Sequence, residues 1–144
     1  VIGKKKIMDL PEVGNMRSTN SANPIACNAG LAVLEEIKIN KLTHKAKING
    51  QLMQNELLKI KKKHPNLFDV YGKGLIAAII FNNNEKNIQI KLKKFVESCI
   101  KDGLLLVYTG RESVKIGPPL VITKDAIIEG VRIIEKNIDL IFNK

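Results

Sequence analysis

One short segment, residues 75–81, constrains the fold of this chain more than any other part. It consists of Leu, Ile, Ala, Ala, Ile, Ile and Phe, without a single polar residue. A run of this length is typical of a β-strand that other parts of the protein cover on both faces. Residues 67–71 are predicted to form a strand before it, because Gly72-Lys73-Gly74 is typical of a tight turn or bulge. Two more strands are expected, at residues 104–108 and 113–116.

Four other segments show the spacing of apolar residues that predicts helices. They are expected from Pro24 to about Ile37, from Leu42 to Lys63, from about Glu85 to Asp102, and after Thr123. The first of them is apolar on most of its surface, so we expect it to be buried on several sides. Asn23, Gly103 and Thr123 are expected to cap helix ends. The order of helices and strands predicts an α+β fold, in which helices cover a small sheet.

Length and composition exclude several classes of protein. The chain has 144 residues and a hydrophobic share of 44%, enough for one domain with a real core. No apolar run approaches the roughly 20 residues of a membrane span. Val1-Ile2-Gly3 followed by Lys4-Lys5-Lys6 is not expected to be a signal peptide, because no long apolar segment follows the charges. The two cysteines, Cys27 and Cys99, are far apart and are expected as buried, reduced thiols. We therefore expect a cytoplasmic protein without a membrane partner.

The net charge of +10 permits binding to nucleic acid, acidic proteins or phosphate. Nearly all of this charge is lysine spread along helical stretches, aromatic content is 4%, and tryptophan is absent. Stacking on single strands needs aromatic residues, and base readout depends largely on arginine. We therefore expect a lysine-rich solvated surface and no nucleic-acid partner. His44 and His64 lack the spacing of a metal site, so both are expected as surface histidines and no metal is expected.

The polar loop Ser18-Thr19-Asn20-Ser21 precedes the first long helix and is the best candidate for chemistry. Hydroxyls and free backbone N–H groups before a helix N-terminus can bind a phosphate. A plain capping loop explains the same residues. Gly72-Lys73-Gly74 is a weaker candidate, because it lacks the spacing and the following helix of a phosphate loop. No self-contained catalytic set is recognised, so no catalytic residue is assigned.

Taken in order, several motifs resemble class III pyridoxal-phosphate aminotransferases of the 4-aminobutyrate, ornithine and acetylornithine type. The resemblance covers essentially the whole chain and corresponds to the C-terminal part of those enzymes. The matching segments are Val1-Ile2-Gly3 with Ile7-Met8-Asp9, Ser18-Thr19 with Asn23-Pro24-Ile25-Ala26-Cys27, Ala29 to Glu35, Val70-Tyr71-Gly72-Lys73-Gly74-Leu75, Gly103-Leu104-Leu105, and Val114-Lys115-Ile116-Gly117-Pro118-Pro119-Leu120.

The resemblance implies a fold-type I homodimer that uses pyridoxal 5'-phosphate to exchange an amino group between an amino acid or amine and a 2-oxo acid. The lysine that binds the cofactor lies upstream of Val1 in the family. Thr19 matches the threonine that reaches the partner subunit's cofactor phosphate, and Ser18 would offer a backbone N–H. Lys115 stands where many members have an arginine that binds a substrate carboxylate, and Tyr71 also replaces a usual arginine. For Tyr71 only structural consequences are expected.

The resemblance also implies a division of the chain into two parts. Residues 1–24 are expected as the end of the large domain with the dimer-contact loop, and residues 25–144 as an interface helix with the C-terminal small domain. The missing start Met fits a fragment, and we expect the fragment by itself to be inactive. Two alternatives remain: an aminomutase or lyase on the same cofactor and fold, or a basic binding domain that is not an enzyme.

Overall fold

The computed structural model describes residues 3–12, 14–15, 18–20, 22–82 and 87–142. They form two compact units, Val1–Ile39 and Asn40–Lys144, and each unit is described by itself. The first unit contains α1 (Lys5–Met8) and α2 (Pro24–Ile39). Val1 and Ile2 lie outside the described residues, and α1 is a single helical turn.

The predicted start of α2 is confirmed. The side-chain Oδ1 of Asn23 accepts a hydrogen bond from the Ile25 N–H at 2.9 Å, and its carbonyl accepts one from the Cys27 N–H at 2.9 Å. Asn23 is therefore the N-cap, and Pro24 occupies the first helical position. The burial expected for α2 is not found, because none of its residues is buried within this chain. Its apolar surface lacks a cover here.

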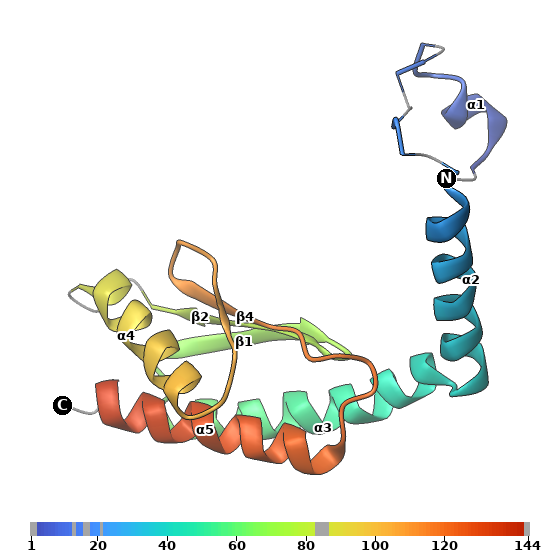
Figure 1. Ribbon diagram of the computed structural model, residues 1–144. Helices are drawn as coiled ribbons and strands as arrows, with labels where there is room; N and C mark the ends of the chain where they lie inside the picture. The colour runs from blue at the N-terminus through green and yellow to red at the C-terminus, as the bar shows by residue number, and fades with distance from the viewer. Residues whose placement is uncertain (1–2, 13, 16–17, 21, 83–86, 143–144) are drawn as a thin grey trace. The chain divides into compact units, whose positions relative to one another are not determined.

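The second unit is built on an antiparallel sheet of four strands in the order β1-β2-β4-β3 (Figure 1). The strands are β1 (Phe68–Lys73), β2 (Ile76–Phe81), β3 (Val107–Tyr108) and β4 (Ser113–Ile116). The helices are α3 (Leu42–Lys63), α4 (Ile88–Lys101) and α5 (Lys124–Phe142). This is the α+β architecture that the sequence predicts.

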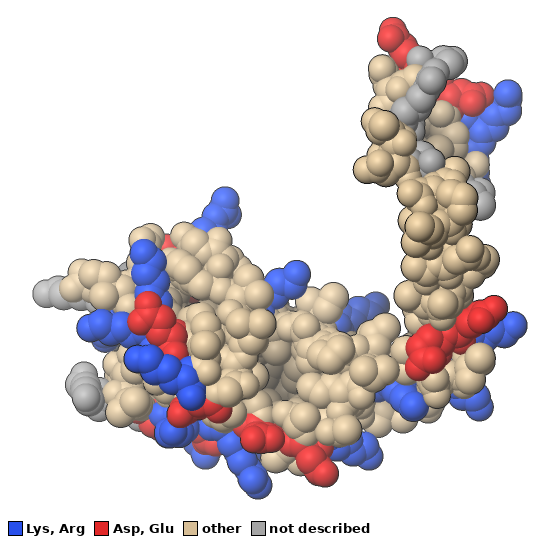
Figure 2. All heavy atoms as spheres, viewed as in Figure 1, with Lys and Arg blue, Asp and Glu red and all other residues tan. Residues whose placement is uncertain are grey.

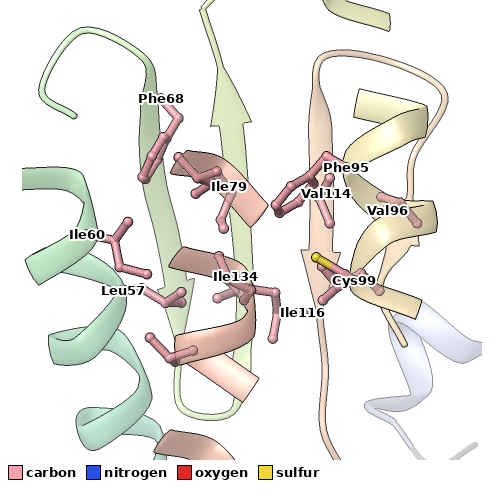
Figure 3. Close-up of a cluster of buried hydrophobic side chains, with 14 of the residues drawn as sticks. Leu57, Ile60, Phe68, Ile79, Phe95, Val96, Cys99, Val114, Ile116 and Ile134 are labelled. Atoms are coloured by element: carbon pink, nitrogen blue, oxygen red, sulfur yellow. The ribbon is translucent and has the colours of Figure 1, made fainter. Parts of the chain in front are cut away.

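All three helices pack on one face of the sheet. Figure 3 shows Leu57 and Ile60 of α3, Ile134 of α5 and Phe95 of α4 around Ile79 and Val114 of the sheet. Phe81 at the end of β2 joins the other three phenylalanines, with ring centroids 5.5 Å from Phe68, 5.9 Å from Phe95 and 5.0 Å from Phe142. Aromatic rings bury large apolar areas, so this cluster ties β1, β2, α4 and α5 together.

The opposite face of the sheet has no cover in the described chain. Along β2, Ala77, Ile79 and Phe81 are at most 2% exposed, whereas Ile76 is 61% and Ile80 is 41% exposed. The prediction that residues 75–81 are covered on both faces is therefore wrong within this unit, since α3, α4 and α5 lie on only one face. We call the uncovered side the open face; it consists of Asp69, Tyr71, Lys73, Ile76, Ala78, Ile80, Val107, Ser113 and Lys115.

Three local details differ from or refine the predicted elements. The strand expected at residues 104–108 is limited to Val107–Tyr108, because the Leu104 N–H instead bonds the Cys99 carbonyl at 2.8 Å and closes α4. Thr123 caps α5 as predicted, with its Oγ1 accepting from the Ala126 N–H at 3.2 Å. His64 is not a surface histidine: its side chain is 10% exposed, and its Nε2 lies 3.0 Å from Asp139 Oδ1.

A close contact between two glycines fixes the β1–β2 turn on α3. A Cβ at Gly50 of α3 would lie only 2.2 Å from the carbonyl carbon of Gly74. Gly74 has a φ of +59°, which favours glycine over residues with a side chain. Gln54, one turn further along α3, donates its Nε2 to the carbonyls of Gly74 at 3.3 Å and Ile76 at 3.2 Å. A tight turn is therefore confirmed, but only Gly74 of the Gly72-Lys73-Gly74 motif belongs to it, together with Leu75, since Gly72 and Lys73 are the last residues of β1.

Gly50→Ala is expected to lower the free energy of unfolding by at least about 2 kcal/mol, because the new methyl group meets main-chain atoms that cannot move aside. Gly130→Ala in α5 is the matched control, since its Cβ would meet only the end of the Leu104 side chain, at 3.3 Å. We expect this control to change the same free energy by no more than about 1 kcal/mol. Urea unfolding followed by circular dichroism measures both. Equal effects of the two variants would show that the close approach of Gly50 to Gly74 does not contribute to the destabilisation.

Candidate functional site

The first candidate site is the short loop before α2. Ser18 and Thr19 are both exposed, and the Asn20 N–H points to the Ser18 Oγ at 3.4 Å. The Thr19 hydroxyl has no hydrogen-bond partner among the residues that the structure describes. Arg17 and Ser21 of the same loop lie outside the described residues. The loop therefore presents at least one hydroxyl donor that the fold of this chain does not use.

This arrangement suits an anion but does not require one. Among the described residues of this loop, Asn23 caps α2, and its bond to the Ile25 N–H does not use the Thr19 hydroxyl. Hydroxyl and backbone N–H donors form strong hydrogen bonds to a phosphate, whose oxygens are charged acceptors. The N-terminal end of a helix adds a partial positive charge nearby. The donor set at Ser18 and Thr19 thus fits a phosphate group as well as a plain capping loop.

The helix that follows the loop presents a long uncharged surface. Residues 24–34 include no Lys, Arg, Asp or Glu, and Figure 2 shows the corresponding part of α2 without charged side chains. Its large apolar side chains are exposed, among them Ile25 at 81% and Leu34 at 63%. Apolar surface of this extent marks a protein–protein contact in soluble proteins.

The second candidate site is Lys115 on the open face of the sheet. Lys115 pairs with Ala78 of β2 on one side and with Val107 of β3 on the other, in the middle of the sheet. Its side chain is exposed and makes no ion pair with any residue in the described ranges. The surrounding large side chains on this face are mostly apolar. An ammonium in such a setting is available to an anion.

A groove of about 490 Å³ runs beside Lys115 along the edge of the sheet. Residues 102–107 and 115–119 form its walls, and the first turns of α5 close one side. Glu129 and Asp102 also line it. Asp102 is held by hydrogen bonds from Asn137 at 2.8 Å and Lys136 at 3.0 Å, and these lower the pKa of its carboxyl. Asp102 is thus tied to α5, and Lys115 is the cation that the groove offers.

Tyr71 lies in the same row of the sheet as Lys115. Tyr71 is opposite Ala78, and Ala78 is opposite Lys115, so the three side chains project from the open face. The tyrosine is 60% exposed. The sequence alone predicts only a structural role for Tyr71. Counting alternate positions along each strand reveals which residues share a face, but the register between strands is needed to place Tyr71 in the row of Lys115.

Other chemically interesting residues do not form a site. Burial, and next the nearby Asp102 charge, raise the pKa of the Cys99 thiol to about 12, so this group stays neutral and structural. Cys27 is exposed in this chain, contrary to expectation, because α2 is uncovered. Within the described part of the chain, no group of three His, Cys, Asp or Glu side chains could hold a metal ion. In that part, too, every helix is too short or too polar to cross a membrane.

Comparison with known proteins finds relatives whose similarity extends over both units of the chain. The Aminotransferase class-III family matches residues 1–138. The acetylornithine aminotransferase of Synechocystis is 35% identical over 93% of this chain, and the leucine/methionine racemase of Thermococcus litoralis is 32% identical over 96%. The crystal structure of acetylornithine aminotransferase from Elizabethkingia anophelis is similar over 96% of the chain, with 32% identity and a TM-score of 0.76.

In each of these comparisons the 144 residues account for only about a third of the relative. The match covers 31% of the Synechocystis protein, 32% of the racemase and 33% of the crystallised chain. Within this chain the match leaves out only the last six residues, and it includes the Ser18-Thr19 loop, α2 and the whole sheet. The chain therefore belongs to the class III aminotransferase family.

Proposed function

We propose that the full-length protein containing these residues is a pyridoxal-phosphate-dependent aminotransferase. It transfers an amino group between an (ω-)amino acid or amine and a 2-oxo acid. The observation that carries this proposal is the family match over residues 1–138. The racemase among the relatives shows that another reaction is associated with this family, so the reaction itself has to be measured. The two free cysteines suit the reducing cytoplasm, where we place the protein.

In this proposal the described residues bind the cofactor but do not react with it. Pyridoxal phosphate, when bound, supplies the electron sink that lets an amino acid lose a proton. The Thr19 hydroxyl and the Ser18 backbone N–H donate hydrogen bonds to its phosphate, from the partner subunit of a homodimer. The support is their exposed position before α2 and the unused Thr19 hydroxyl. The cofactor lysine belongs to the part of the protein outside residues 1–144.

The same proposal gives α2 and Lys115 their roles. An apolar helix with no buried residue needs a cover, and we assign that cover to the partner subunit. Lys115 provides the positive charge for an anionic group of the substrate, since it has no carboxylate partner among the described residues. The expected division, with residues 1–24 ending the large domain and residues 25–144 forming the interface helix and small domain, is part of this proposal.

The decisive experiment uses the full-length protein with pyridoxal phosphate. We expect it to take up the cofactor, seen as an absorbance band above 400 nm at roughly one equivalent per subunit. It should then produce a new amino acid from an ω-amino donor and 2-oxoglutarate, detected by mass spectrometry. Residues 1–144 alone should do neither. A full-length protein that takes up no pyridoxal phosphate would refute the proposal, and racemisation without amino transfer would refute the assigned reaction.

Thr19→Ala is expected to weaken retention of pyridoxal phosphate by the full-length protein by about 1.5–3 kcal/mol, because one hydrogen bond to a charged group is lost. Equilibrium dialysis of the cofactor measures the dissociation constant. Thr19→Ser is the matched control, since it keeps the hydroxyl and should stay close to the wild type. Unchanged retention in Thr19→Ala would leave the capping-loop explanation of Ser18 and Thr19 as the correct one.

Leu34→Lys is expected to shift the full-length protein from dimer to monomer at micromolar concentration, because it would bury an unpaired ammonium in the proposed interface. Sedimentation velocity measures the change. The control is Ile90→Lys on α4, a residue that is similarly exposed, at 55%, but is not part of α2. We expect the control to remain dimeric. Dissociation by both variants, or by neither, would contradict the assignment of α2 to the subunit interface.

A further inference from the structure

Two polar side chains of the open face, those of Tyr71 and Lys115, lie in one row with a single small residue between them. Ala78 of β2 is paired with both. Since neighbouring strands are about 4.8 Å apart, the Cα atoms of the outer two residues are about 10 Å apart. Both side chains are long, and the alanine methyl group between them fills little of the space above β2. A small ligand above Ala78 can therefore be reached from both sides.

The hydrogen-bond donors of these two side chains are not used in contacts among the described residues. Neither the Tyr71 hydroxyl nor the Lys115 ammonium has a hydrogen-bond or ion-pair partner within the described ranges. Of the other polar groups on this side, Asp69 forms an ion pair with Lys61 of α3, and the Ser113 hydroxyl lies 2.7 Å from that of Thr109, whereas Lys73, two residues after Tyr71 on β1, is exposed and adds a second cation. Asp69 therefore does not neutralise Lys115.

The surroundings favour an anion at this position. Ile76, Ile80 and Val107 on the same face are 41–61% exposed and are apolar. Burying these apolar side chains is favourable, so any part of the full-length protein that covers this face would leave it dry. A cation in a dry setting needs an anionic partner, because an unpaired buried charge is costly.

We propose that Tyr71 and Lys115 together bind one carboxylate group of the substrate, which makes Tyr71 a specificity-determining residue. This inference rests on the proposed function, whose amino acids and 2-oxo acids carry carboxylates. An arginine binds a carboxylate with two N–H donors held in a fixed fork, whereas a lysine supplies a point charge without that geometry. The Tyr71 hydroxyl supplies the second, directional donor. Together, the lysine provides the positive charge and the tyrosine the directional donor that a single guanidinium would provide.

The test compares 2-oxoglutarate with its dimethyl ester, in which both carboxylates are neutral. Binding of each to the full-length protein loaded with pyridoxal phosphate is measured by calorimetry, and KM and kcat are measured for 2-oxoglutarate. Tyr71→Phe should raise the dissociation constant and the KM for 2-oxoglutarate about tenfold, as expected for a lost hydrogen bond to a charged group. Its kcat and its affinity for the ester should change less than about twofold. Lys115→Met should weaken binding of 2-oxoglutarate more strongly.

The most decisive comparison measures the effect of Tyr71→Phe in a protein that also carries Lys115→Arg. The arginine provides both donors itself, so removing the tyrosine hydroxyl there should change the KM less than about twofold. Tyr108→Phe is the control, because Tyr108 pairs with Val114 in the row that faces the helices. Thermal melting and the cofactor absorbance band verify that every variant is folded and loaded.

The other possible results would contradict either the carboxylate site or the proposed function. An equal effect of Tyr71→Phe on 2-oxoglutarate and the ester, no effect on either, or the same effect in the Lys115→Arg background overturns the shared carboxylate site. Amino transfer by the wild type combined with equal binding of acid and ester also overturns the site, but leaves the proposed function intact. A wild-type protein that neither takes up the cofactor nor transfers amino groups overturns both.

Discussion

The packing of three helices on one face of the sheet determines the rest of the second unit. Phe81 contacts the other three phenylalanines, and Ile79 and Val114 are completely buried beneath the helices. A slip of one residue in any strand would expose this apolar set, so the register of β2 against its neighbours is strongly specified. The Gly50–Gly74 contact fixes the turn at the other end of β2. With the inner face fixed, the residues of the open face have only one possible arrangement.

Local signals were sufficient for most elements of the fold. The bounds of α3, the Asn23 and Thr123 caps and the strand at residues 113–116 agree with the predictions, because each depends on neighbours in sequence. The prediction of a strand over residues 104–108 was too long, because the Leu104 N–H completes the end of α4. The expected burial of α2 and of both faces of β2 also failed, but for another reason. A sequence pattern reflects burial in the whole protein, and this chain covers only part of that surface.

Only those residues of the candidate site that belong to recognisable sequence motifs could be predicted. Ser18 and Thr19 are recognisable from their place before Asn23-Pro24, and Lys115 from the motif that ends in Pro118-Pro119. Tyr71 lies 44 positions before Lys115 and has no motif of its own that connects it with the lysine. Their common row depends on two strand pairings through Ala78, which involve segments distant in sequence. Such pairings come from packing of the complete sheet rather than from local preference.

The two uncovered surfaces have the same physical meaning. An apolar helix without buried residues and a sheet with one bare apolar face both expose area that stabilises a protein when it is removed from water, by about 25 cal/mol per Å². A lysine on such a face is tolerated while the face is wet, but needs an anion once it is covered. In the proposed carboxylate site, covering the sheet would favour substrates that bring a negative charge, since these would neutralise Lys115 at the step that removes water. In that proposal, specificity for a carboxylate follows from the burial itself, and the Tyr71 hydroxyl supplies the directional hydrogen bond that the Lys115 charge lacks.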